Sequence, residues 1–185
     1  MNIQAFVRIR AWDKAGILFH DKEEESHSFV RAFLQIVLEQ ISEASIAAVI
    51  DTGGTSRTVG TSGLLAANGA VNTSTKGIRI GTGSTAVDIA DNKLVTEIVT
   101  GLGSGQMVHQ AQSNPTAVTT ADPDVTFVIN RNFNNNSGAS ITVSETAIYC
   151  ITSSFTFCIV RDVPTAVIVP DGGGCNVAYT LKITE

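Results

Sequence analysis

The chain has 185 residues, of which 43% are apolar and 16% charged, and its formal net charge is -5. This length fits one domain, or one domain with an arm, and the apolar content is too high for a disordered chain. A sequence pI near 5.1 argues against a general nucleic-acid binder, which needs a basic patch. With 19 Val, 18 Ile and 21 Thr, the composition favours β-sheet.

The N-terminal part predicts a strand pair followed by a helix. Residues 3–12 alternate in polarity, residues 13–16 carry a turn signal, and residues 17–20 can return as a second strand. Ser26 is the expected helix N-cap, with Glu23, Glu24 and Glu25 near the positive end of the helix dipole.

The predicted helix carries a wide apolar stripe at spacings of three and four. Its members are Phe29, Val30, Phe33, Leu34, Val37, Leu38 and Ile41. A stripe this wide indicates a helix covered on more than one side, either by the chain's own sheet or by a neighbouring subunit.

Residues 51–77 are mostly Gly, Thr, Ser, Ala and Asn, interrupted by Leu64 and Leu65. This texture predicts a flexible arm or loop that orders against a partner. The chain then divides into a strand pair with a helix (1–50), the arm (51–77) and a β domain (78–185), which we expect to form one structural domain overall.

Strand signals dominate from residue 125 onward. Alternating segments cover residues 125–130, 141–151, 155–159 and 175–183, with a shorter one at 167–169 and a short turn at Ser153 and Ser154. Short strands at this spacing predict a mainly β fold, an antiparallel β-sandwich or jelly-roll-like domain with one N-terminal α-helix.

Two glycine-rich patches invite a phosphate-loop interpretation. Gly81-Thr82-Gly83-Ser84 follows an apolar strand, but no Lys followed by Ser or Thr completes a Walker pattern, and no third glycine completes a dinucleotide fingerprint. We expect structural turns there and at residues 101–105. The acidic pairs at 122 and 124 and at 88 and 91 lack the carboxylate density of a calcium site, so solvated turns are favoured.

The histidines are His20, His27 and His109, and no two stand at zinc-site spacing. A Gly-x-Ser-x-Gly nucleophile elbow is also absent from the sequence. We therefore expect no metal, no cofactor, no catalytic residue and no enzymatic activity.

The three cysteines are expected to be reduced and buried. If Ser153-Ser154 is a two-residue turn, Cys150 pairs with Phe157 and Tyr149 pairs with Cys158, so the two thiols point to opposite faces. An odd cysteine count agrees with free thiols.

Glu145 shares an apolar strand face with Ile141, Val143, Ala147 and Tyr149. A buried carboxylate needs a partner, and Arg131 and Arg161 are the candidates in adjacent strands. A bulge that turns Glu145 outward is an equal alternative.

Residues 1–30 contain basic residues and three consecutive glutamates but no apolar leader segment, and no stretch reaches the roughly 18 apolar residues of a membrane helix. We expect the chain to be made and folded in a cytoplasm, with neither a membrane nor a nucleic acid as a partner.

A resemblance to a known family is carried by residues 28–34, 77–87, 133–138 leading into 141–145, 158–163 and 177–183. Through these stretches most of the chain, apart from about residues 44–75, resembles small virion structural proteins of tailed bacteriophages. Residues 144–149 are also similar to a strand of tail-fibre and collar proteins, in which a glycine often stands where this chain has Ala147.

The resemblance implies a non-enzymatic subunit of a phage virion, made in the bacterial cytoplasm. Its partners would be other virion proteins and copies of itself, in a symmetric homo-oligomer at the head, neck or tail. The residues expected to mediate self-association are Phe29, Phe33, Leu34, Leu38, Leu64 and Leu65. A receptor- or glycan-binding module of a phage fibre is the alternative.

Overall fold

The computed structural model describes residues 2–26, 28–60, 65–114 and 117–184. The fold is mainly β, with 52% of residues in strands and 7% in the one helix of the described residues, and its sheets are antiparallel. This confirms the mainly β fold class with one N-terminal helix. The finer arrangement as a sandwich or jelly roll stays a prediction.

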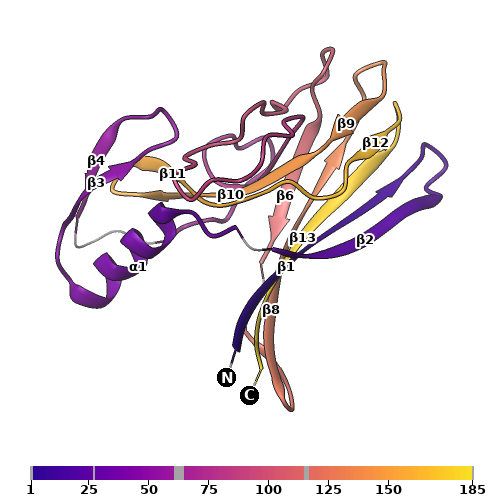
Figure 1. The fold of residues 1–185 in the computed structure, drawn as a ribbon. Coiled ribbons are helices and arrows are strands. Elements are labelled where there is room, and N and C mark those ends of the chain that lie inside the picture. Colours follow the sequence, from indigo (N-terminus) through magenta and orange to yellow (C-terminus); the bar gives the residue numbers. More distant parts are fainter. Residues whose placement is uncertain (1, 27, 61–64, 115–116, 185) are drawn as a thin grey trace.

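The large sheet has the strand order β2-β1-β13-β8-β6, and β7 also pairs with β8. Its strands are β1 (Asn2–Trp12), β2 (Leu18–Ser26), β6 (Val108–Ser113), β7 (Thr119–Ala121), β8 (Asp124–Asn134) and β13 (Gly174–Thr184). Because β1 pairs with β13 along both full lengths, the two chain ends lie side by side at the lower end of this sheet (Figure 1).

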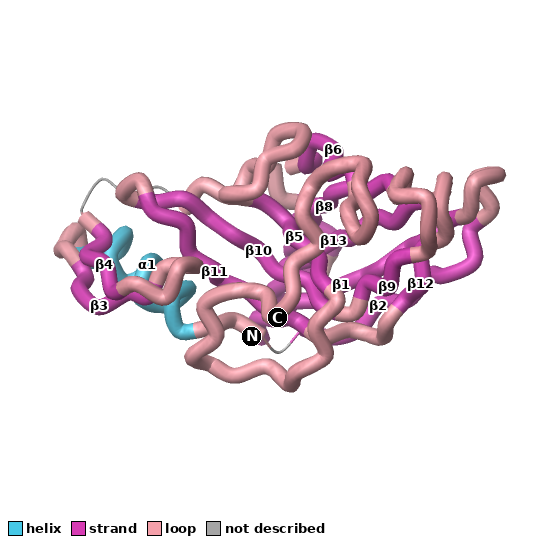
Figure 2. Tube along the Cα trace, turned by 90° about the horizontal axis from the view of Figure 1, so that it is seen from above, coloured by secondary structure: helices cyan, strands magenta, loops and turns pink. Residues whose placement is uncertain are grey.

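The small sheet has the order β11-β10-β5. Its strands are β5 (Gly77–Gly81), β10 (Glu145–Thr152) and β11 (Phe155–Asp162). Two further strand pairs complete the fold, β9 (Ile141–Val143) with β12 (Val167–Val169) and β3 (Ile46–Ile50) with β4 (Ser56–Val59). Helix α1 (Arg31–Ser42) and the β3–β4 pair lie together at one end of the molecule (Figures 1 and 2).

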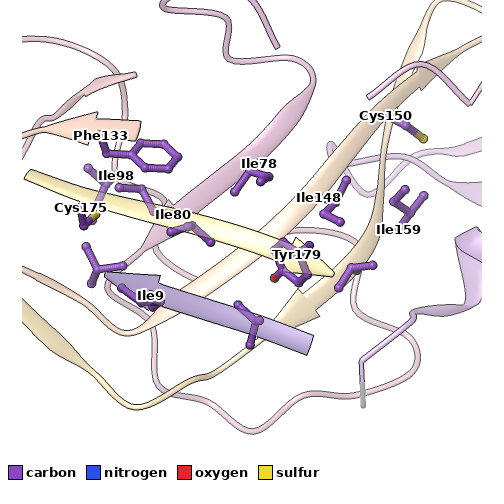
Figure 3. Packing of buried hydrophobic residues seen from close by; sticks show 14 of the residues in the cluster. Ile9, Ile78, Ile80, Ile98, Phe133, Ile148, Cys150, Ile159, Cys175 and Tyr179 are labelled. Atoms are coloured by element: carbon purple, nitrogen blue, oxygen red, sulfur yellow. The ribbon is translucent and has the colours of Figure 1, made fainter. Parts of the chain in front are cut away.

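The period-2 pattern of the sequence builds the core. The pairing registers place Val7, Tyr179 and Ile129 in one row across β1, β13 and β8, and Ile9, Val177 and Arg131 in the next. Figure 3 shows Ile9, Tyr179 and Cys175 of the large sheet facing Ile78, Ile80 and Ile148 of the small sheet. Both sheets therefore bury one apolar face in the same core.

The predicted hairpin at the end of the small sheet is confirmed residue by residue. Ser153 and Ser154 have φ values of 49° and 69°, the positive pair that a two-residue type I′ turn requires. Cys150 pairs with Phe157 and Tyr149 with Cys158, as expected, and a bulge follows Ile148.

The predicted start of the helix is wrong. Residues 23–25 belong to β2, and Ser26 ends that strand with its Oγ donating to Asp162 Oδ2 at 2.9 Å. The actual N-cap is Val30, which provides no side-chain hydrogen bond. The chain forms a longer β2 because β1 offers it an edge to pair with, a long-range contact that outweighs the local capping signal.

The segment 51–77, predicted as an arm, contains β4 and several fixed contacts. Asp51 Oδ1 accepts hydrogen bonds from the amides of Gly53 and Thr55, and Ala66 forms a bridge with Ile151. Mobility of this segment in the free chain, and with it the division at residues 51 and 77, stays a prediction.

All three cysteines are free and buried. Burial raises the pKa of Cys150 and of Cys175 to about 12 and also raises the pKa of Cys158. Since the thiolate is the reactive form, folded protein at pH 8 should react negligibly with a thiol reagent. Denatured protein, prepared without reductant, should titrate three thiols per chain, whereas a single thiol would reveal a disulfide and contradict the hairpin register.

Candidate functional site

The outer face of the small sheet carries buried charge. Across its three strands, Ala147 of β10 pairs with Arg79 of β5 on one side and with Arg161 of β11 on the other. Both arginines are fully buried. The connection between β5 and β6, residues 82–107, lies over this face and carries the groups that bind them.

Glu145 lies at the start of β10 and is fully buried. Its Oε1 accepts hydrogen bonds from the amides of Gly83 at 3.0 Å and Thr96 at 2.7 Å, and its Oε2 accepts one from Val95 at 3.0 Å. Arg161 Nη2 lies 3.1 Å from Oε2. The charge of Glu145 is thus balanced by one guanidinium and three backbone donors. Of the two candidate partners, Arg161 rather than Arg131 binds it, and Glu145 is not turned outward by a bulge.

Arg161 also binds the covering segment directly. Its Nη1 donates to Asp91 Oδ2 at 2.7 Å and its Nη2 to the carbonyl of Thr85 at 2.9 Å. Burial disfavours the charge, but Asp91 and then Glu145 outweigh it, so the pKa of Arg161 is raised above its usual value.

The first glycine patch is explained by this carboxylate. A Cβ at Gly83 would lie 2.4 Å from Glu145 Oε1, and one at Gly81 would lie 2.5 Å from the same atom. Gly81 ends β5, Gly83 follows two residues later, and both leave the space that the Glu145 side chain occupies. The turn prediction therefore missed their packing role.

Arg79 forms a second buried cluster. It makes an ion pair with Glu97, donates to the Thr73 carbonyl at 2.6 Å, and places Nη1 3.0 Å from His109 Nδ1. Because a guanidinium only donates, His109 accepts at Nδ1 and is neutral with its proton on Nε2. Burial, then Arg79 and Arg131, lower the pKa of His109 to about 3.

Arg131 is the third buried arginine, and its hydrogen bonds within the described chain go to backbone carbonyls. The acceptors are the carbonyls of Ala70, Thr73, Ile78 and Gln110. Burial, with a smaller effect of Arg79, lowers its pKa to about 10. This side chain ties residues 70–73 to both sheets but does not bind Glu145.

The charged side chains of these clusters have structural partners. Each arginine and carboxylate is engaged in holding irregular chain against a sheet, and among the described residues there is no metal-binding group of three or more His, Cys, Asp or Glu side chains. Of the two acidic pairs, Asp91 binds Arg161, and Asp124 of β8 binds Lys182. In the parts of the chain that the structure describes, no helix has the length and apolarity needed to cross a membrane.

An apolar groove of about 610 Å³ opens between the start of α1 and the large sheet. Its walls include Phe29, Phe33, Leu65, Val118, Phe127 and Leu181. Ile148 and Ile159 of the small sheet also line it. The groove exists because the inner face of β8 and β13 continues beyond the small sheet, so that Phe127 and Leu181 are only half-buried.

Five of the six predicted self-association residues are described by the structure, which separates them into two groups. Phe29, Phe33 and Leu65 line the groove, whereas Leu34 and Leu38 are exposed on α1, and Leu64 lies outside the described residues. The sequence pattern missed the contribution of β8 and β13, because the alternation of these strands indicates burial along their whole length.

Comparison with protein families, with curated proteins and with solved structures finds no match to this chain.

Replacing Glu145 by Gln should destabilise the fold. The substitution keeps the volume but removes the charge opposite Arg161 and puts an NH₂ group among donors. We expect a loss of about 2–4 kcal/mol in the free energy of unfolding in urea, since Arg161 keeps Asp91. Glu23→Gln, at an exposed position, is the control and should change the free energy of unfolding by less than about 0.5 kcal/mol. If the two variants are equally stable, the buried contacts of Glu145 do not stabilise the fold as we expect.

His109 should make the fold acid-sensitive. Its folded pKa of about 3 lies below the ordinary 6.5, so below pH 6.5 the unfolded chain gains a proton that the folded chain excludes. Stability is lost as pH falls, by about 2 kcal/mol between pH 6.5 and 4.5 from this group. His109→Asn keeps an acceptor for Arg79, and its free energy of unfolding should fall by about 2 kcal/mol less than that of the wild type between pH 6.5 and 4.5, measured by urea titration at the two pH values. If both proteins show the same pH dependence, His109 is not the source of the acid sensitivity.

Proposed function

We propose that this chain is a non-enzymatic structural subunit of a tailed-bacteriophage virion, which assembles with copies of itself into a symmetric oligomer. The observation that carries the proposal is the apolar surface left uncovered around α1. The virion role rests on the resemblance of residues 28–34 and of four stretches between residues 77 and 183, while the self-association rests on the surface itself.

Helix α1 uses only part of its circumference within its own chain. Ala32, Ile36 and Glu39 are buried, whereas Leu34 and Leu38 are exposed by 66% and 53%. Ile41 is 78% exposed. We call Leu34, Leu38 and Ile41 the helix ridge. At 100° per residue, Phe33 and Val37 lie between the buried side and the ridge, so the apolar surface is continuous from the groove around the helix.

The free energy available from this surface is substantial. Full burial of a Leu or Ile side chain is worth about 1.5–3 kcal/mol, and roughly two-thirds of each ridge side chain remains to be buried. The ridge alone can therefore contribute about 3–6 kcal/mol to an interface. A contiguous apolar patch of this kind on a small domain marks an interaction site.

Other features fit a subunit of a permanent assembly. Three buried thiols suit assembly in the bacterial cytoplasm, and the shared core of the two sheets supports the sandwich-like domain expected for a virion part. The partners that we propose are further copies of this chain and other virion proteins.

The alternative, a glycan- or receptor-binding module, has less support. Sugar platforms use exposed aromatic rings, and of the 8 Phe, 2 Tyr and 1 Trp only Phe19 is exposed, by 50%. Phe29, Phe33 and Phe127 are of intermediate burial and line the groove. Their placement favours an apolar protein partner.

The purified chain should form an oligomer at micromolar concentration, measured by light scattering after size exclusion. Leu34→Ser with Leu38→Ser, the ridge variant, should weaken association by about 2–4 kcal/mol, or about 30- to 1,000-fold in Kd. Its fold should be unchanged, since both side chains are exposed.

Ile168→Ser is the matched control, because Ile168 is 62% exposed and its strand, β12, lies at the other end of the molecule from α1 (Figure 1). This variant should assemble as the wild type does. A wild-type chain that is monomeric at 100 µM would refute the proposed self-assembly.

A further inference from the structure

The helix ridge and the groove differ in shape and lie at different positions around α1. Leu34, Leu38 and Ile41 follow one another at i, i+4 and i+7, the spacing with which amphipathic helices insert anchor residues into apolar grooves. The groove is concave and lined almost wholly by apolar side chains. The convex apolar ridge is therefore complementary in shape and polarity to the concave apolar groove.

The two surfaces cannot meet within one copy of the chain. Ile36 is fully buried, and Leu34 and Leu38 stand two residues on either side of it, about 200° away around the helix axis. The ridge consequently points away from the domain to which α1 is fixed. A ridge can enter only the groove of another copy.

The buried polar side chain of the groove is already engaged by the chain itself. Gln112 Oε1 accepts from the amide of Ile78 at 2.7 Å, and Gln112 Nε2 donates to Ala67 O at 2.9 Å and to Asn114 Oδ1 at 2.6 Å. Small-molecule sites keep a few polar groups free to orient the ligand. A groove whose buried amide is engaged in this way fits an aliphatic occupant better than an amphiphile with a headgroup.

We infer that the helix ridge of one copy inserts into the groove of a second copy, so that the interface joins two different surfaces of the same chain. This inference rests on the proposed self-assembly and specifies its contact. Each copy then offers one ridge and one groove, which gives a two-fold dimer when the two contacts are reciprocal and a ring when the rotation closes. On this inference the main interface is neither a contact between two ridges nor one between two grooves.

Complementation between two variants tests the inference. The ridge variant (Leu34→Ser with Leu38→Ser) keeps its groove, and a groove variant (Val118→Asp with Phe127→Ser) keeps its ridge. Each should be monomeric alone at a concentration where the wild type assembles. An equimolar mixture should form a mixed dimer, detected by light scattering and by native mass spectrometry, because one intact ridge meets one intact groove.

Val118→Asp alone provides a second groove variant if Phe127→Ser lowers stability, because Val118 is 58% exposed and its replacement should leave the fold intact. Urea unfolding measures whether both groove variants are still folded. A mixture of Ile168→Ser with the ridge variant or the groove variant should associate to the same extent as a mixture with the wild type.

Failure of the mixture to associate, while the wild type assembles, overturns the ridge-in-groove contact and leaves the proposed function standing. Wild-type-like assembly of the groove variants also overturns it. A small apolar molecule that copurifies with the wild type and is lost on Val118→Asp would assign the groove to a ligand instead. A monomeric wild type overturns the proposed function together with the inference.

Discussion

A mismatch in strand length determines the shape of this protein. Strands β1, β8 and β13 are each 11 residues long, whereas the small sheet that covers them has strands of 5 to 8 residues. Along the inner face, Val7 and Tyr179 are buried, Phe127 and Leu181 half-buried, and Ile3 is 67% exposed. The same alternating pattern that builds the core thus continues past its cover and leaves an apolar face at the end where both termini lie (Figure 1).

The other face of the small sheet is covered by a different means. The connection 82–107 has no strand or helix of its own in the described chain, yet it is fixed through Asp91, Glu97 and the amides that bind Glu145. Buried ions are costly to desolvate, and each arginine here is retained because carboxylates and backbone carbonyls surround it. The charged face thus stabilises irregular chain, while the apolar face stabilises sheet packing.

Local patterns predicted much of the fold, because a strand with one buried face has a period of two. The face shared by Val7, Ile9 and Ala11, the turn at Ser153 and Ser154, and the opposite faces of Cys150 and Cys158 all follow from that period. Glu145 was identifiable as a charge on an apolar face. Its partner was one of two arginines, and only the register of β10 against β11 decides for Arg161.

The rest depends on contacts between distant segments. Ser26 follows glutamates and precedes a helix, so its local pattern is that of a cap, although β1 recruits it into a strand. The partners Asp91 and Glu97 come from a loop without periodicity. The groove arises from the relative lengths of two sheets, which no single segment encodes. The wide apolar stripe of the helix indicated that α1 is covered on more than one side. Within one chain only the side with Ala32 and Ile36 is buried, and the helix ridge is left exposed.

The central claim is that a second copy provides the missing cover. A benzophenone side chain at position 38, in an assembly mixed from isotopically labelled and unlabelled copies, tests this directly by photo-cross-linking and mass spectrometry. The account predicts cross-links between copies to the peptides that carry Val118, Phe127 or Leu181. Cross-links to the α1 peptide of another copy, or none between copies in a formed assembly, would contradict it.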